Sequence, residues 1–399
     1  TWSYWLKISN VSSGENFVFA TRDANNNNYR TYFRINDNNS FAVFMYDAGG
    51  TLIVNKQTTR VFRDPSAWYH VVYRVDTTQA NVNDRVRLYV NNVEETSFTS
   101  DTNPSQNATI RTASSVYTAW GHNAPSGGAY FDGSMSHINF IDGTAYDATA
   151  FGETDATTGE WKAKTSPSVT YGTNGFFILK DGNGITDQSG EGNDFTLGGG
   201  TLTDLKDNPD NVFATWNFLS SPSNGNVGDV TGSNGNTTTS SLGTGYRSYP
   251  ATLGYTTGKF YWEIKRNNTT NDCHLGITNE DLTPANQATW IGNTANGWMY
   301  GSDGGLTYNS GTDTNTGYSS STTGDIIMVA HDATNGKLYF GKNGSWQGSS
   351  NPSTEASPAF TGLSTSKFWF PAFSAGSSNS ANFGNGYFGT TAITTNSGN

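Results

Sequence analysis

The sequence predicts an all-β protein built from two tandem β-sandwich domains. Aromatic side chains make up 14% of the 399 residues. They occur with β-branched residues in short runs separated by Gly and Asn, which is typical of strands joined by turns. No window of helical length shows an apolar period of about 3.6 residues. A chain of this length exceeds what one hydrophobic core usually fills, so we expect two domains.

Residues 1–152 are expected to form the first sandwich. The run 68–76 (WYHVVYRVD) places every second apolar side chain on one face, and the run 85–92 (RVRLYVNN) does the same before an Asn-Asn turn. One helical turn is predicted at 64–68, because Asp64 can cap it and a proline follows at the first helical position.

A looser segment, residues 153–211, is expected to connect the two sandwiches. Its glycine-rich part, KDGNGITDQSGEGNDFTL, spaces Gly, Asp and Asn as calcium-binding nonapeptide repeats do. One copy cannot build a calcium-bound β-roll, because each ion is shared between successive repeats. We therefore expect residues 175–197 to form a β-hairpin that packs on the first sandwich or bridges it to the second. A lone Ca²⁺ at Asp181, Asp187 or Asp194 is the alternative.

Residues 212–395 are expected to form the second sandwich. Within them, ATNG (333–336) joins two alternating runs as a hairpin, and the polar run 220–245 predicts a long loop or exposed ribbon. The single cysteine, Cys273, excludes an intramolecular disulfide. It alternates with apolar residues in CHLGI, which predicts a core thiol.

Charge excludes some partners. The net charge is −11 and no run of basic residues occurs, so neither nucleic acid nor an anionic membrane surface is expected as a partner. No apolar run of about 18 residues is present, so no membrane insertion is expected. The chain begins inside a strand-like run, TWSYWLKIS, which is typical of a fragment of a longer protein.

The second half carries six blocks in a specific order: GKFYWEIK, HLGIT, NGWMYGSDG, TGDIIMVAHDATNGKLYFGKNGSW, FWFPAFS and ANFG. This order over residues 212–390 resembles the SPRY domain. The resemblance implies a bent β-sandwich that binds partners through loops at one end, with no catalytic residues.

The first half resembles the laminin-G-like, concanavalin A-like jelly roll through YWLKIS, AWYHVVYRVD, RVRLYVNNVEE and YFDGSMSHINFIDGTAYDATAFG. Both domains together, with the strings between them, resemble fibre-like virion proteins of marine tailed bacteriophages. That resemblance implies a non-enzymatic tail-fibre-like protein on the particle surface, without cofactors. Its partners would be a host-surface glycan or protein and other virion proteins, and it would be a homo-oligomer such as a trimer.

Catalytic motifs are weak in this sequence. A concanavalin-type glycosidase needs two carboxylates close together, but Glu94 and Glu95 are adjacent and Glu263 stands alone in its strand. The five histidines lack metal-ligand spacing, and His70, His137 and His274 fall in strand patterns that predict structural roles. We therefore expect neither an enzyme nor a metal site. A glycan depolymerase with carboxylates from distant strands is the minor alternative.

Sugar binding needs an aromatic face and polar side chains beside it. The loop AWGHNAPSGGAYFDG offers Trp120, His122, Asn123 and Tyr130, although Trp120 and Tyr130 also fit core positions at strand ends.

In the second half, Tyr308 and Tyr318 lie among Asn, Gly, Ser and Thr and are the predicted contact residues, whereas Trp298 is predicted to be core. The sequence therefore favours a host-binding adhesin. A virion decoration or joining protein that docks other subunits is the alternative.

Overall fold

The computed structural model describes residues 1–9, 14–23, 29–112, 116–123, 129–180, 182, 184–220, 230–241, 246–269, 272–302, 305–314, 317–374 and 376–393. Contacts divide the chain into two compact units: unit 1 comprises Thr1–Asp204 and Asn208–Val212, and unit 2 comprises Leu205–Asp207 and Phe213–Asn399. The predicted all-β class is confirmed, since the described residues contain one α-helix, the four-residue α1 (Pro284–Gln287). None of the helices in these ranges is long and apolar enough to span a membrane.

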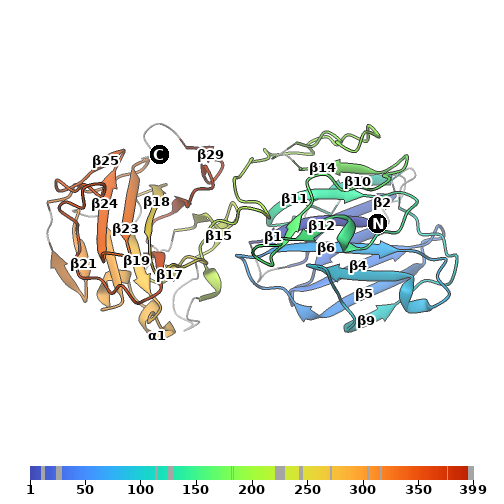
Figure 1. Cartoon of the computed structure of the whole chain (residues 1–399), viewed down its shortest axis with the longest axis horizontal. Helices are drawn as coiled ribbons and strands as arrows, with labels where there is room; N and C mark the ends of the chain where they lie inside the picture. The colour runs from blue at the N-terminus through green and yellow to red at the C-terminus, as the bar shows by residue number, and fades with distance from the viewer. Residues whose placement is uncertain are drawn as a thin grey trace. The chain divides into compact units, whose positions relative to one another are not determined.

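Unit 1 is a sandwich of two six-stranded antiparallel sheets (Figure 1). The first sheet has the order β14 (Phe176–Ile178), β11 (Gly133–Phe140), β1 (Trp2–Ile8), β6 (Trp68–Val75), β7 (Val86–Val90) and β8 (Val93–Glu94). The second has the order β10 (Val116–Trp120), β2 (Asn16–Asp23), β3 (Tyr29–Ile35), β4 (Ser40–Tyr46), β5 (Leu52–Val61) and β9 (Phe98–Thr102).

Aromatic rings fill the space between these sheets. On β1, alternate residues point inward, and Trp2 and Tyr4 lie with their ring centroids 5.4 and 6.2 Å from Phe33 of the opposite sheet. The other face of β1 is covered by the hairpin of β12 (Gly152–Thr154) and β13 (Trp161–Ala163). Trp161 donates its indole N–H to Nδ1 of the buried His70 at 3.0 Å. The segment after residue 152 is therefore packed onto unit 1.

Unit 2 is a second antiparallel sandwich (Figure 1). Its seven-stranded sheet has the order β15 (Gly232–Ser233), β16 (Thr238–Thr239), β27 (Asn379–Asn382), β18 (Lys259–Arg266), β23 (Ile326–Asp332), β24 (Lys337–Lys342) and β25 (Ser345–Trp346). Its six-stranded sheet has the order β17 (Ser248–Pro250), β26 (Trp369–Ser374), β19 (His274–Asn279), β20 (Gly297–Gly301), β21 (Thr307–Asn309) and β22 (Thr312–Thr314). A separate hairpin joins β28 (Tyr387–Phe388) and β29 (Thr391–Ala392).

The core of unit 2 brings the two sheets together, with Tyr300 of β20 5.9 Å from Phe340 of β24 between ring centroids. Cys273 is buried in this core, as predicted. The predicted hairpin at 333–336 is confirmed as the β23–β24 turn. Within the predicted loop or exposed ribbon 220–245, residues 221–229 and 242–245 lie outside the described residues. The exposed ribbon is wrong for the described part, since β15 and β16 join the seven-stranded sheet through β27 and Thr237 and Thr239 are buried.

Two local predictions need correction. Asp64 accepts a hydrogen bond from the Ser66 N–H at 2.8 Å, but residues 65–66 form a turn rather than a helical turn. The segment 175–197 packs on unit 1 as predicted, because β14 pairs with β11. The predicted hairpin is wrong, since residues 184–197 form no strand; Phe177 of β14 donates its N–H to the Asp187 carboxylate and accepts the Gln188 N–H at its carbonyl oxygen.

Candidate functional site

A pocket of about 360 Å³ opens in unit 1, where the edge strands β10 and β14 approach each other. Trp120 of β10 and Phe176 of β14 lie with their ring centroids 6.5 Å apart. Aromatic and short polar side chains from both sheets and from the loop after β14 line the pocket: Trp2, Phe19, Phe140, Phe176, Phe195, Thr112, Thr118, Asn174, Asn193, Asp194 and Thr196.

A chain of aromatic rings forms the apolar part of this pocket. Trp2 lies 5.0 Å from Phe140, Phe140 lies 5.6 Å from Phe176, and Phe176 meets Phe195 edge-on at 4.8 Å between centroids. The first three rings are buried, whereas Phe195 is half-buried. Phe195 therefore adds a partly accessible aromatic ring to a floor that belongs to the core of the sandwich.

One carboxylate accepts four of the hydrogen bonds that hold the glycine-rich loop 184–197, beside backbone bonds such as that from the Gln188 N–H to the Phe177 carbonyl at 2.8 Å. Asp187 Oδ1 accepts from the N–H groups of Phe177 at 2.8 Å and Ser189 at 2.9 Å. Its Oδ2 accepts from the Ser189 hydroxyl at 2.7 Å and the Asn193 N–H at 3.0 Å. Burial pulls the pKa of Asp187 upward, but these hydrogen bonds outweigh burial and hold that pKa below its usual value. Four protein donors thus engage both carboxylate oxygens of Asp187, whereas Asp181, another of the predicted Ca²⁺ candidates, lies outside the described residues.

The polar rim presents mainly acceptors. Asn193 donates its side-chain N–H groups to the carbonyls of Thr173 and Gly175, and Asn174 donates to Asp142 Oδ2 at 2.7 Å. Their amide oxygens accept no hydrogen bond from a described residue. Asp194 accepts the Asp187 N–H through Oδ1, and its Oδ2 is engaged by no described residue. The site is therefore suited to a ligand that supplies O–H or N–H donors.

The four predicted contact residues of unit 1 separate into two groups. Trp120 packs into the core against Phe19, with centroids 4.7 Å apart, so the core interpretation of Trp120 holds. Tyr130 is 65% exposed and lies 5.8 Å from His122 between ring centroids, and Asn123 accepts a hydrogen bond from Arg22. The core interpretation of Tyr130 is wrong. His122, Asn123 and Tyr130 thus form a small surface cluster beyond the end of β10.

The two predicted tyrosines of unit 2 lie in different environments. Tyr308, on β21, is half-buried, and its ring meets Trp290 edge-on at 5.1 Å between centroids. Tyr318 is 6% exposed and belongs to the core, with its hydroxyl 3.3 Å from Ser350 Oγ. Its assignment as a contact residue is therefore wrong, because the polar residues around it in sequence do not keep its ring in solvent. Trp298 packs against the core at Trp369, as predicted.

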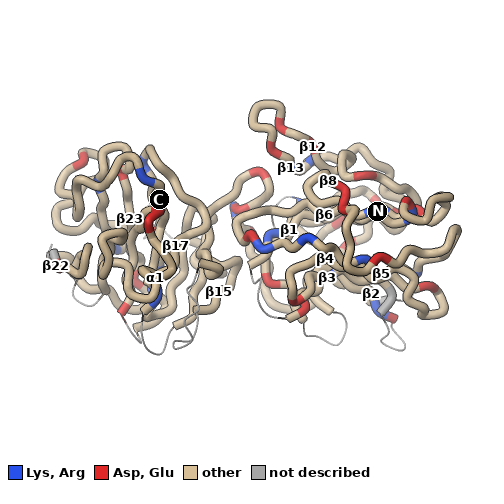
Figure 2. Tube along the Cα trace, turned by 90° about the horizontal axis from the view of Figure 1, so that it is seen from below, with Lys and Arg blue, Asp and Glu red and all other residues tan. Residues whose placement is uncertain are grey.

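Groups of acids, histidines or cysteines suited to a metal ion do not occur among the described residues. His70 and His137 are buried and bind serine hydroxyls at 2.8 and 2.7 Å, which fits their predicted structural roles. Glu263 is buried against the Tyr261 hydroxyl and the Asn382 amide. Among the described lining residues of the unit 1 pocket, Asp194 is the one carboxylate, so the described part of the site does not place two acids there. Figure 2 shows few charged residues, scattered along both units.

The pocket residues from 193 to 196 were not among the predicted binding residues. The spacing of Gly, Asp and Asn in this stretch predicts a turn and resembles a metal site, and Phe195 is the one residue in it that indicates a binding wall. The approach of this loop to β10 depends on the pairing of β14 with β11.

Comparison with known families gives the domain content of the chain. Residues 1–149 match the family model of the concanavalin A-like lectin/glucanases superfamily, and residues 259–386 match that of the SPRY domain. The chain therefore contains a concanavalin A-like domain followed by a SPRY domain, as the sequence blocks predicted. Domains of both kinds are typically binding domains.

Among solved structures, the chain is similar to the SPRY domain of human HERC1, with 18% sequence identity and a TM-score of 0.34. The match covers 42% of this chain and 98% of that one. No curated protein matches the chain.

Proposed function

We propose that this chain is a non-enzymatic adhesion protein of a bacteriophage particle, and that unit 1 binds a glycan of the host surface. The observation that carries the glycan assignment is the pocket between β10 and β14, which combines a partly accessible aromatic ring with a rim of hydrogen-bond acceptors. The assignment to a phage particle rests on the sequence blocks that resemble fibre-like virion proteins.

A sugar ring matches both halves of this pocket. Its C–H face can pack on Phe195, and its hydroxyls can donate to the oxygens of Asn174, Asn193 and Asp194. The hydroxyls of Thr112 and Thr118 can serve as donors or acceptors on the β10 side. The carboxylate of Asp194 repels an acidic sugar, so the expected ligand is a neutral or amino sugar.

The binding test uses the whole chain and fragments of purified host-surface polysaccharide, with isothermal titration calorimetry as the readout. Truncating Phe195→Ala removes the accessible ring and should weaken binding about tenfold, because partial burial of a phenylalanine is worth about 1.5 kcal/mol. Phe368→Ala is the matched control, since Phe368 is an exposed phenylalanine of unit 2. Equal affinities of the wild type and Phe195→Ala would refute the assignment of the pocket.

The surface cluster of His122, Asn123 and Tyr130 lies in the same unit and is proposed as an additional contact surface for a long glycan. Tyr130→Ala should weaken binding of long fragments and leave the affinity for short fragments unchanged. If both fragment lengths lose affinity equally, the cluster belongs to the primary site.

The particle surface is the proposed location, with other virion subunits as further partners and a homo-oligomeric assembly. Antibodies raised against the chain should label the surface of purified particles in electron micrographs. Labelling that appears after particle disruption but not before would favour the alternative, a joining protein buried between virion subunits. Release of reducing sugars from the host polysaccharide would replace the adhesin assignment with a depolymerase.

A further inference from the structure

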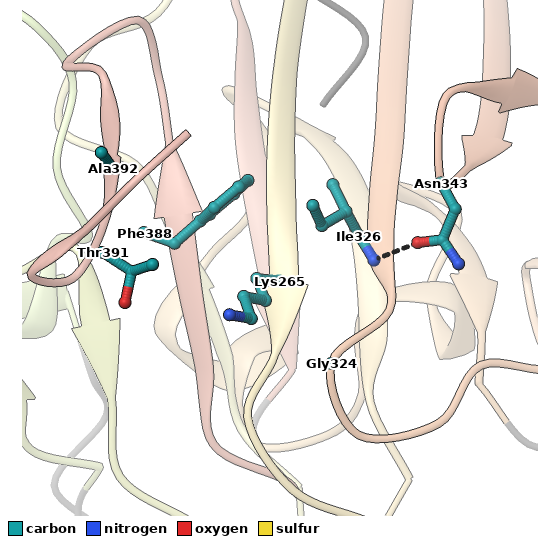
Figure 3. A pocket seen from close by; sticks show the side chains of 7 residues that line it. All are labelled: Lys265, Gly324, Ile326, Asn343, Phe388, Thr391 and Ala392. Carbon is teal, nitrogen blue, oxygen red and sulfur yellow. Dashed lines mark hydrogen bonds between the residues drawn. The ribbon is translucent and has the colours of Figure 1, made fainter. Parts of the chain in front are cut away.

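A second pocket, of about 270 Å³, lies in unit 2 on one face of the seven-stranded sheet. Figure 3 shows Lys265 of β18 between Phe388 and Thr391 on one side and Ile326 and Asn343 on the other. Ile264 is fully buried in the sandwich core, so alternation along β18 directs Lys265 to the opposite face. There the β28–β29 hairpin supplies Phe388 and Thr391 as one wall of the pocket.

Lys265 differs from the other strand lysines of unit 2. The ammonium groups of Lys259, Lys337 and Lys342 each lie within 3.7 Å of a carboxylate oxygen. Lys265 is half-buried and forms no ion pair or hydrogen bond with a described residue. Lys265 thus brings to the pocket an ammonium that has no counter-charge among the described residues, which favours binding of an anionic group.

The neighbouring acids are already engaged. Glu263, two residues earlier on β18, is buried against Tyr261 and Asn382. Asp325 accepts a hydrogen bond from the Asn343 amide at 2.7 Å and lies 3.7 Å from Lys342. These carboxylates are held by other partners and lie outside the pocket lining.

The pocket also offers donors beside the ammonium. Asn343 Oδ1 accepts the Ile326 N–H at 2.8 Å, and the Asn343 amide donates one of its two N–H groups to Asp325. The second N–H and the Thr391 hydroxyl are engaged by no described residue. Figure 3 shows the Lys265 ammonium directed toward the side of Thr391 and away from Asn343, so the ammonium and the Thr391 hydroxyl are the donors that suit the two oxygens of one carboxylate.

The residues that line the Lys265 pocket favour the carboxylate of a peptide over that of a sugar acid as its ligand. A sugar ring needs an exposed aromatic face, but Phe388 is 5% exposed and Ile326 is also buried. An Asp or Glu side chain has a short apolar stem and one carboxylate, which match the apolar wall residues and the single ammonium of this cavity. We propose that the Lys265 pocket binds an acidic side chain of a partner polypeptide. This site is distinct from the glycan pocket of unit 1.

The test titrates the whole chain with the capped peptide Gly-Glu-Gly, followed by NMR shifts of the lysine side chains. The Glu peptide should shift the Lys265 signal, and the capped Gly-Gln-Gly peptide should bind at least about tenfold more weakly, since a charged hydrogen bond is worth about 1.5 kcal/mol or more. Lys265→Met should abolish binding, Lys265→Arg should retain it, and the nearby control Lys342→Met should leave it unchanged.

Equal binding of the Glu and Gln peptides, no binding of the Glu peptide, or full binding by Lys265→Met would overturn the proposal. Galacturonate serves as the sugar-acid arm, and its binding as tightly as the Glu peptide would overturn the assignment to a polypeptide. Thermal unfolding of Lys265→Met, compared with Lys265→Arg, verifies that a loss of binding does not reflect a misfolded unit 2.

Discussion

Asp187→Ala is expected to release the loop 184–197 and to remove one wall of the glycan pocket. The substitution deletes the acceptors of four hydrogen bonds, from the N–H groups of Phe177, Ser189 and Asn193 and from the Ser189 hydroxyl. At a net value of about 0.5–1 kcal/mol each, their loss lowers the free energy of local opening by about 2–4 kcal/mol. The β-sandwich itself loses no core side chain, so its unfolding midpoint should change little.

Hydrogen–deuterium exchange measures this local opening directly. Amides in residues 184–197 should exchange about 30- to 700-fold faster in Asp187→Ala, because each 1.4 kcal/mol is a factor of about ten. Glycan affinity should fall in parallel, since Asn193, Asp194 and Phe195 lose their positions. Asp187→Asn keeps one acceptor oxygen and should give an intermediate effect.

Asp155→Ala is the matched control for this experiment. Asp155 also accepts two backbone N–H groups, from Thr157 and Thr158, in the β12–β13 turn, and it is absent from the pocket lining. The Asp155→Ala variant should leave both the hydrogen–deuterium exchange of residues 184–197 and the glycan affinity unchanged. If the Asp187→Ala loop exchanges at the wild-type rate, Asp187 does not hold the loop and the reasoning fails.

Three further predictions address selectivity, pH and the core thiol. Asp194→Asn should increase the affinity for uronic-acid fragments while neutral fragments bind as before, and calorimetry showing unchanged discrimination would contradict the role given to this carboxylate. Burial lowers the pKa of His70 to about 3 and that of His331 to about 4. The same histidines have an ordinary pKa near 6.5 in the unfolded chain, so the unfolded chain binds more protons than the folded chain at pH values between the folded and unfolded pKa values. Stability should therefore fall as pH drops from 7 to 5, by about 2 kcal/mol per histidine, and urea midpoints that coincide at the two pH values would refute this. Cys273 is buried, and burial raises the pKa of its thiol to about 12, so a disulfide reagent should label the native chain no faster than unit 2 unfolds; labelling within the mixing time would show that the thiol is accessible.

Local sequence patterns were sufficient to predict the strands and much of the core. Alternation in the runs 68–76 and 274–278 corresponds to β6 and β19, because a strand with one face in a core must repeat its apolar residues at every second position. The turn at 333–336 was predictable for a similar reason, since Gly336 adopts a positive φ that a tight hairpin requires. Cys273 also followed from alternation alone.

Predictions that depend on neighbours distant in sequence were less successful. Tyr318 lies among small polar residues, yet its ring packs into the unit 2 core, because burial depends on which elements fold over a segment. Tyr130 shows the opposite outcome, an aromatic residue left in solvent beyond its strand. Neither outcome follows from the flanking residues.

The sequence by itself determined that this chain is all-β, that it carries a concanavalin A-like domain before a SPRY domain, and that Gly, Asp and Asn build a turn near residue 190. Tertiary structure alone decided what that turn does. The pairing of β14 with β11 places the loop beside β10, and the Asp187 carboxylate accepts the Phe177 N–H of β14. A stretch that resembles a metal site thereby forms one wall of a pocket, because its hydrogen-bond partners are residues that lie near it in the folded chain and not only its neighbours in sequence.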